Sequence, residues 1–221
     1  MFMPRHFEED DRSEAVAMAR STGFGHLVVV GTDGLLSTPM PFLINDDATV
    51  LRGHLAKPNP ILKAAPRDAL FVIPVSDAYI SPGWYPSKAE HGKVVPTWNY
   101  EVVHLHGRLA VHDQLWTDRM VRDLTDHHEA GMSSPWSVDD APPDHVAGLL
   151  RAIVGVSLEV TRVVAKRKLS QNKSPADLDG AIDGLRTGEG CGGHDVADAM
   201  RAQSHTSHDG DLAAATPPDM D

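Results

Sequence analysis

The sequence predicts a mainly β protein with peripheral helices, in which six antiparallel strands form a barrel and the helices pack outside it. Six segments are rich in the β-branched and aromatic residues that favour strands. Asp-Gly and Asn-Asp turns connect several of them as hairpins. Long helices do not alternate regularly with these segments, as a doubly wound parallel sheet would require.

The first half of the chain is predicted to be a run of strands joined by tight turns. A helix over 10–21 precedes the run, because its apolar residues fall on one side. Pro39 and Pro41 imply that the second strand lies at an edge or contains a bulge. The predicted strands are 24–31, 35–44, 49–55 and 69–75, with a short helix at 60–65.

The second half begins with a long segment of little regular pattern, 77–99, whose aromatic residues argue against disorder. Alternating apolar residues then predict a strand at 101–112, and a further strand follows at 153–164. The remaining predicted helices are 115–130, 144–151, 175–186 and 195–202.

Composition limits the classes of protein to which the chain can belong. Its 221 residues suit one domain, predicted over 1–203, and the acidic stretch 204–221 is interpreted as a disordered tail. The single cysteine and the missing signal peptide favour the cytoplasm. No apolar stretch is long enough to span a membrane. The net charge of -11 disfavours tight non-specific binding to nucleic acid.

The first candidate site is the segment Arg52-Gly53-His54-Leu55-Ala56-Lys57-Pro58-Asn59-Pro60, which leads from a strand through a turn into a helix. The unpaired N–H groups of a helix start, beside Lys57, are a plausible seat for a phosphate. The alternative is a solvated lysine with Asn59 as the N-cap of a helix that begins at Pro60.

The second candidate comprises Thr97, Trp98, Asn99 and Tyr100, at the start of a predicted strand. A hydroxyl, an amide and two aromatic rings suit a flat polar heterocycle, because rings cover its faces and amides satisfy its edge atoms. The alternative is a core Trp98 with Asn99 bonded to local backbone.

The third candidate is the densest basic cluster of the chain, Lys166 to Lys173, which includes Lys168, Ser170, Gln171 and Asn172. Such a cluster can hold a phosphate or a nucleic-acid backbone, and its usual alternative is a solvated charged face. His104 and His106 share one face of a strand, but no cysteine or carboxylate completes a metal site at a recognisable spacing. No metal site is therefore predicted.

Five strings together resemble the PaiB-like family of FMN-binding negative transcriptional regulators. They are Met3–Phe7, Gly53–Pro60, Ala78–Pro86, Lys93–Tyr100 and Lys168–Asn172. The Val-Pro-Thr-Trp-Asn-Tyr and Lys-Leu-Ser-Gln-Asn strings are the most specific, and the resemblance extends over nearly the whole chain.

The resemblance implies a six-stranded antiparallel split β-barrel of the FMN-binding type, related to pyridoxamine phosphate oxidase, that forms a homodimer. It implies that the cofactor-binding residues lie in three segments. The first is the strand-turn-helix with Arg52, His54, Lys57 and Asn59, where Lys57 is the charge partner of the FMN phosphate. Thr97–Tyr100 would lie along the flavin or ribityl chain, and Lys168–Asn172 would reach the pocket from the other subunit.

Three functions compete at this point. The first is an FMN-binding regulator of the PaiB-like type, whose effect is expected to be indirect because the acidic chain lacks a clear helix-turn-helix. The second is a flavin-dependent oxidoreductase acting on an unknown small molecule. The third is a haem-binding split barrel with His54, His104 or His106 as axial ligand. Fold and cofactor do not fix a reaction, so no catalytic residue is assigned.

Overall fold

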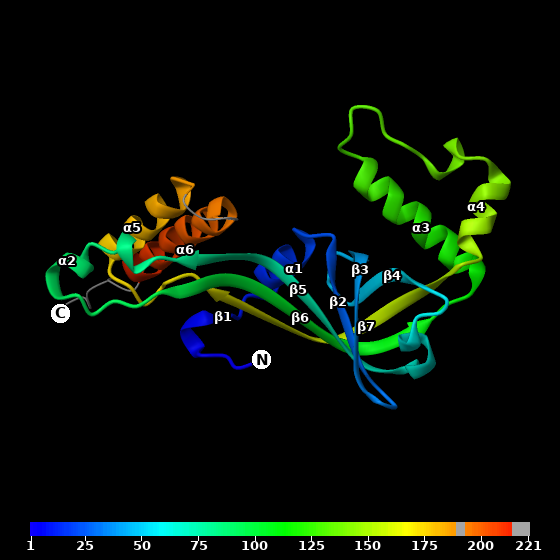
Figure 1. Cartoon of the computed structure of the whole chain (residues 1–221), viewed down its shortest axis with the longest axis horizontal. Helices are drawn as coiled ribbons and strands as arrows, with labels where there is room; N and C mark the ends of the chain where they lie inside the picture. The colour runs from blue at the N-terminus through cyan, green and yellow to red at the C-terminus, as the bar shows by residue number, and fades with distance from the viewer. Residues whose placement is uncertain (189–192, 214–221) are drawn as a thin grey trace, which may run out of the picture. The chain divides into compact units, whose positions relative to one another are not determined.

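The structure, a computed structural model that describes residues 1–188 and 193–213, contains one sheet and six α-helices in the described part of the chain (Figure 1). The strands are β1 (Glu8–Glu9), β2 (Phe24–Gly31), β3 (Gly34–Ile44), β4 (Val50–Ala56), β5 (Arg67–Ile80), β6 (Thr97–Val111) and β7 (Ile153–Lys168). The helices are α1 (Arg12–Arg20), α2 (Ser87–His91), α3 (Gln114–Glu129), α4 (Pro143–Leu150), α5 (Pro175–Arg186) and α6 (Gly193–Ala213), with short 3-10 turns η1 (Arg5–Phe7), η2 (Pro60–Ala64), η3 (Pro82–Trp84) and η4 (Val138–Asp140).

The strands form a closed barrel. In the described part of the chain their order is β1-β7-β4-β3-β2-β5-β6, and a further pairing joins β7 to β6. That pairing closes six strands into a ring, while the two-residue strand β1 pairs with β7 outside it. The predicted fold class is confirmed, and β1 is the one strand that the sequence did not predict.

The chain divides into two compact units, which are described separately. Unit 1 comprises Met1–Glu9, Pro74–Val102 and Ala165–Asp221, and unit 2 comprises Asp10–Ile73 and Val103–Val164. Strands β5, β6 and β7 each begin in one unit and end in the other. The single domain predicted over 1–203 therefore contains two such units.

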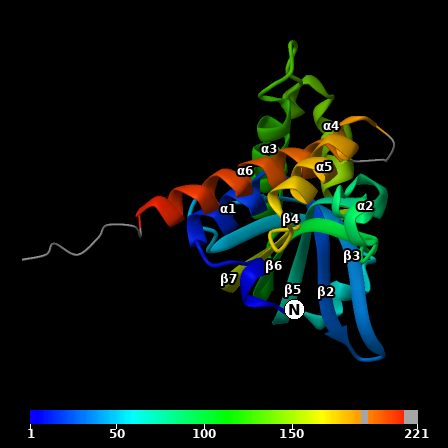
Figure 2. The same ribbon diagram turned by 90° about the vertical axis from the view of Figure 1, so that its left-hand side faces the viewer.

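Unit 2 is organised by the β2–β3 hairpin, which pairs along its whole length from Phe24↔Pro41 to Gly31↔Gly34. The predicted Asp-Gly turn lies at its tip, and Gly34 has the positive φ of 121° that such a turn requires. Inside the unit, the rings of Phe42 and Phe71 meet edge to face, with centroids 5.2 Å apart. Helices α3 and α4 lie next to each other in both views (Figures 1 and 2).

The prolines of β3 lie where the strand has one strand neighbour. β4 pairs with β3 only from Phe42 to Ile44, whereas β2 pairs with it from Gly34 to Pro41. Pro39 and Pro41 therefore leave no ladder hydrogen bond to β4 unmade. The expectation of an edge position is confirmed for this part of β3.

Unit 1 is built around helices α5 and α6, which pack side by side (Figure 2). Gly184 of α5 makes room for the ring of Trp84, because a Cβ there would lie 2.3 Å from it. The apolar cluster of this unit draws on the end of β5, the turn after β7 and both helices, and includes Ile80, Tyr85, Leu169, Ile182, Val196 and Met200.

Three strands extend beyond their predicted ends. β5 continues to Ile80 because Ala78 and Ile80 point inward while Tyr79 points outward, so the segment predicted as irregular from 77 contains a strand end, η3 and α2. β6 begins at Thr97 and β7 continues to Lys168, which places the second candidate segment and the first residues of the third in strands. Helix α6 runs to Ala213, past the predicted start of the tail, and 214–221 lie outside the described residues.

Candidate functional site

The first candidate segment, in unit 2, runs from β4 into η2 through the turn Lys57-Pro58-Asn59. Asn59 is the N-cap of η2: its Oδ1 accepts from Ile61 N at 3.0 Å, and Pro60 is the first residue of the turn. Leu62 N donates to the Asn59 carbonyl at 3.2 Å. The first N–H groups of η2 are thus already bonded, which confirms the N-cap alternative and contradicts a phosphate seat made of free helix N–H groups.

The turn nevertheless gathers polar side chains at the open edge of β3. Asn59 Nδ2 donates to Thr38 Oγ1 at 3.1 Å, and both residues are half-buried. Lys57 is exposed, and no ion pair involves its ammonium group among the residues that the structure describes. Its backbone N–H donates to Ala152 at 2.9 Å, which fixes the position of the turn. An exposed lysine without an ion-pair partner in the described structure is therefore two residues along the chain from the hydrogen-bonded amide and hydroxyl.

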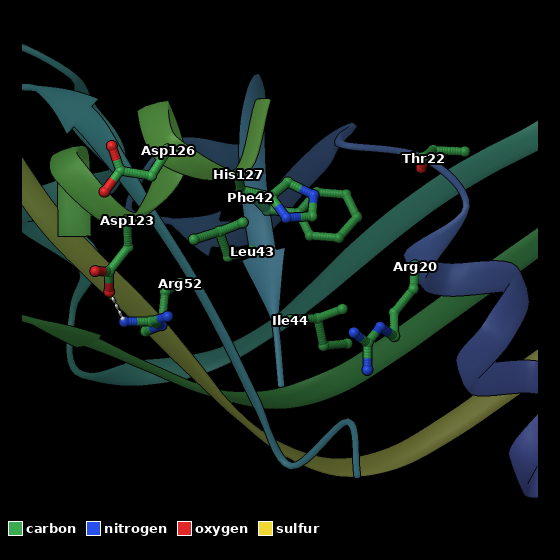
Figure 3. Close-up of a pocket in the computed structure, with 9 residues that line it drawn as sticks. All are labelled: Arg20, Thr22, Phe42, Leu43, Ile44, Arg52, Asp123, Asp126 and His127. Carbon is green, nitrogen blue, oxygen red and sulfur yellow. Dashed lines mark hydrogen bonds and ion pairs between the residues drawn. The ribbon is translucent and has the colours of Figure 1, made fainter. Parts of the chain in front are cut away.

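Arg52 lies near the other end of β4 and is engaged elsewhere. Its Nη1 is 2.7 Å from Asp123 Oδ2 of α3, and Figure 3 shows the two side chains directed toward each other. Both belong to a pocket of about 370 Å³ that Arg20, Phe42, Ile44, Asp126 and His127 also line. Because a strand advances about 3.3 Å per residue, Arg52 lies well away from the turn at Lys57.

His54 follows Arg52 on the same face of β4. Its Nδ1 is buried and has no hydrogen-bond partner among the described residues. Burial lowers the pKa of the His54 imidazole, which favours the neutral ring. A buried ring nitrogen without a partner costs about 1–3 kcal/mol, a cost that a bound polar group would remove.

In unit 1 the structure brings the second and third candidate segments together. The Asn99 amide and the Ser170 hydroxyl are 3.0 Å apart, and Asn99 Nδ2 also lies 3.3 Å from Met200 Sδ. Asn99 has no exposed surface. Its partners are side chains distant in sequence, so the alternative in which it bonds local backbone is wrong.

Trp98 is exposed rather than part of the core, which contradicts the other half of that alternative. Its ring lies edge to face with Tyr79 of β5, with centroids 6.2 Å apart, and about half of each side chain is exposed (54% and 47%). These two rings form an aromatic surface on unit 1 that a planar ligand can cover.

The basic run is not a solvated face. Lys166 is buried, its Nζ donates to the Phe2 carbonyl at 3.2 Å, and it lies 5.3 Å from the centre of the Tyr100 ring. Arg167 forms ion pairs of 3.1 Å with both Glu9 and Glu101. The solvated-face alternative is therefore wrong for these residues.

Lys168 and Gln171 are also engaged by the chain. Lys168 Nζ donates to Thr97 Oγ1 and to the Trp98 carbonyl, and burial lowers the pKa of its ammonium group. Gln171 Oε1 accepts from Leu169 N at 2.8 Å, and its Nε2 donates to the Arg167 carbonyl at 2.6 Å. Asn172 is exposed. The third segment thus holds the start of β6 in place.

Two further histidines that the sequence singled out lie in β6. His104 and His106 lie on one face of β6 with ring centroids 6.3 Å apart, as predicted. Across the part of the chain that the structure describes, no three His, Cys, Asp or Glu side chains gather around a common point. Sequence reasoning missed Thr38, Tyr79 and Met200, because their contacts join strands and helices that are remote in sequence.

Residues 1–162 match the family described as "Putative FMN-binding domain". The chain belongs to this family. The match covers more than half of the chain and includes the first two candidate segments, but ends before Lys168. Membership in the family confirms the prediction of FMN as cofactor.

Two relatives are similar over most of the chain, and the first covers more of it than the family match does. Protease synthase and sporulation protein PAI 2 of Bacillus subtilis (strain 168) is 29% identical over 207 residues, covering 90% of this chain and 96% of that protein. An uncharacterised protein of Aspergillus fumigatus is 30% identical over 198 residues, covering 68% and 76%. The resemblance to the PaiB-like family is confirmed.

Solved structures share the fold at low identity. The flavocytochrome Anf3 of Azotobacter vinelandii matches with a TM-score of 0.57 and 18% identity, covering 75% of this chain and 72% of that one. The FAD and Heme binding protein of Mycobacterium smegmatis matches with a TM-score of 0.55 and 15% identity, covering 80% and 79%. Both likenesses show the split-barrel fold.

The residues present fit FMN chemically. The turn in unit 2 offers an ammonium, an amide and a hydroxyl, which are suitable partners for a phosphate. None of the described helices is both long and apolar enough to cross a membrane.

Proposed function

We propose that the phosphate of FMN is held at the turn between β4 and η2, with Lys57 as its charge partner and Asn59 and Thr38 as neighbouring polar groups. The observation that carries the proposal is the ammonium of Lys57, which has no ion-pair partner in the described structure and lies two residues from the Asn59–Thr38 hydrogen bond. Arg52 is left out because Asp123 already engages it.

The test compares two ligands that differ by one phosphate. The variant Lys57→Ala is titrated with FMN and with riboflavin, following the quenching of flavin fluorescence. We expect FMN affinity to fall about tenfold while riboflavin affinity changes little, because only FMN carries the charge. Equal losses for both ligands would show that Lys57 does not contact the phosphate.

Lys63→Ala is the matched control. Lys63 is also an exposed lysine of this segment, within η2, so its removal changes the net charge equally. Its effect on FMN affinity should be small. The absorption spectrum of the purified protein provides a second check, since a Soret band in place of flavin bands would support the haem alternative.

The role that best suits this chain is that of an FMN-binding regulator acting indirectly in the cytoplasm, as a homodimer. Net charge of -11 and the engaged basic run both disfavour a DNA-binding surface. Bound FMN supplies one- and two-electron redox chemistry. On this proposal, the regulatory signal is the oxidation state of the flavin, or whether FMN is bound at all. A partner other than DNA receives this signal.

A flavin-dependent oxidoreductase is the second candidate, and the Tyr79–Trp98 surface favours it. Two exposed aromatic rings beside the engaged Lys168 suit a planar small-molecule substrate. The rate at which candidate small molecules reoxidise the photoreduced flavin, measured anaerobically, distinguishes the oxidoreductase from the regulator. Turnover that falls in Trp98→Ala would favour the enzyme, and the absence of turnover would favour the regulator.

A further inference from the structure

A second cavity lies entirely within unit 1, between the turn after β7 and helices α5 and α6. Its volume is about 460 Å³, within the usual range for small-molecule sites. The floor is apolar: Leu169 and Met200 are buried there, and Leu178 is half-buried. This cavity accepts an apolar body of moderate size.

The polar groups at the cavity are mostly committed to other groups of the chain, and the ammonium group of Lys173 is the exception. Gln171 uses both its amide oxygen and its amide nitrogen within the turn. Lys173 lies over the Tyr85 ring, with Nζ 4.9 Å from its centre, and no ion pair involves it among the described residues. Arg201 Nη1 forms an ion pair of 2.8 Å with Asp179 Oδ1. Lys173 therefore forms no direct ion pair among the described residues, although its charge interacts with that of the Asp177 carboxylate.

We propose that this cavity binds a small organic anion with an apolar body, such as an aryl or branched alkyl carboxylate. The apolar part covers Leu169, Leu178 and Met200, and the carboxylate faces Lys173 and Arg201. In a chain of net charge -11, long-range attraction does not favour an anion, so local cations must select it. The inference does not rest on the binding of FMN.

Met200 connects the cavity to the start of β6, so a ligand bound in the cavity can affect that strand. Its side chain forms part of the floor, and its Sδ lies 3.3 Å from Asn99 Nδ2. Asn99 in turn lies between Trp98 and Tyr100, the residues of the second candidate segment. A ligand that shifts Met200 therefore acts on the buried amide that holds this strand start.

The test uses three probes that share a phenylbutyl body and differ in charge: phenylbutyrate, phenylbutanol and phenylbutylamine. Binding to the full chain is followed by NMR of methionine methyl groups, with Met200 assigned through Met200→Leu. We expect phenylbutyrate to bind with a Kd at or below about 1 mM and to move the Met200 signal. Met18 and Met120, which lie in unit 2, should not move.

Two pairs of variants then test whether the positive charges of Lys173 and Arg201 contribute to the binding of phenylbutyrate. Lys173→Met should weaken phenylbutyrate about fivefold, and Lys173→Arg should retain most of the affinity. Arg201→Ala is compared with Arg186→Ala, because each removes a 2.8 Å ion pair between α5 and α6 and only Arg201 lines the cavity. Arg201→Ala should weaken binding, and Arg186→Ala should leave it unchanged.

Several results would overturn the proposal. They are no saturable binding of phenylbutyrate, equal affinity for all three probes, an unmoved Met200 signal, or equal effects of the two arginine variants. Thermal unfolding of each variant shows that it is folded at the temperature of the titration. A shift of Met200 that is selective for the anion and lost in Lys173→Met would establish the site.

Discussion

The side chains of Asn99 and Ser170 are hydrogen-bonded to each other through both polar atoms of the amide. Nδ2 donates to the serine Oγ at 3.0 Å, and Oγ donates to Oδ1 at 3.1 Å. The pair ties the start of β6 to the turn after β7 in a position where Asn99 is fully buried. Ser170 has a φ of 65°, in the left-handed region that favours glycine. A serine therefore occupies a position whose backbone conformation is less favourable for it than for glycine.

Ser170→Ala is expected to destabilise the protein by about 1–3 kcal/mol, because it leaves a buried amide without its partner. Ser170→Gly removes the same hydroxyl but accepts the positive φ, so we expect it to cost about 1 kcal/mol less. Urea unfolding of both variants measures the difference. Unchanged stability of Ser170→Ala would contradict the role assigned to the pair.

The sequence predicted elements well where local signals agree with the tertiary structure. The segment 24–31 is strand β2, and 175–186 is helix α5, with Ser174 as its N-cap and Pro175 at its first position. The Asn-Pro dipeptide likewise identified Asn59 as an N-cap. Caps and alternating patterns are read from adjacent residues, so no knowledge of distant neighbours was needed.

The predictions that were wrong concern residues whose surroundings are set by strands that pair across long separations in the sequence. Trp98 faces outward because Asn99 occupies the inward position of β6, which alternation alone does not decide. Arg167 finds Glu9 and Glu101 through strand pairing, which turns an expected solvated charge into an ion-pair network. Thr38 belongs to the candidate site because its hydroxyl accepts a hydrogen bond from Asn59, which lies 21 residues away in the sequence.

Stability should fall as the pH drops below about 6.5, the ordinary pKa of histidine. Burial is the first cause that lowers the pKa of His54, His106 and His112. Because these rings take up protons in the unfolded chain before they do so in the folded one, acidification favours unfolding. The stability is fully present above the unfolded pKa and is lost as the pH falls toward the lower, folded pKa.

His54→Gln and His106→Gln should each reduce this dependence, which urea unfolding between about pH 5.5 and 7.5 would measure. His26→Gln is the control, since His26 is an exposed histidine of β2. A steeper loss of stability on acidification in His54→Gln than in the parent chain would contradict the lowered pKa of the His54 imidazole.

We expect a homodimer in solution. The β2–β3 hairpin exposes Phe24, Val30 and Leu35, and Val30 and Leu35 are direct cross-strand partners. An apolar face of this kind favours burial against a second copy. Light scattering should give twice the 23.9 kDa of one chain. Leu35→Lys should weaken the dimer, whereas Leu149→Lys, at an exposed leucine of α4, should not. A single 23.9 kDa particle at micromolar concentration would contradict the dimer.

We expect no tight, sequence-specific binding of duplex DNA by the isolated protein. The basic run is the densest positive cluster, yet three of its four basic residues are engaged: Arg167 pairs with two glutamates, Lys166 is buried, and Lys168 bonds Thr97 and Trp98. To contact phosphates, these groups would have to give up partners that they already have. The chain as a whole is acidic, with 31 Asp and Glu against 20 Lys and Arg.

Salt dependence separates specific binding from weak adhesion. A protein that neutralises several phosphates loses affinity with a log–log slope of about -0.9 per phosphate. Labelled duplex, including the region upstream of the gene for this chain, is titrated at low and moderate salt. Binding restricted to the lowest salt and indifferent to sequence would agree with indirect regulation. Nanomolar, sequence-selective binding with a steep slope, lost when Lys166, Arg167, Lys168 and Lys173 are neutralised, would show that this run releases its partners to bind DNA directly.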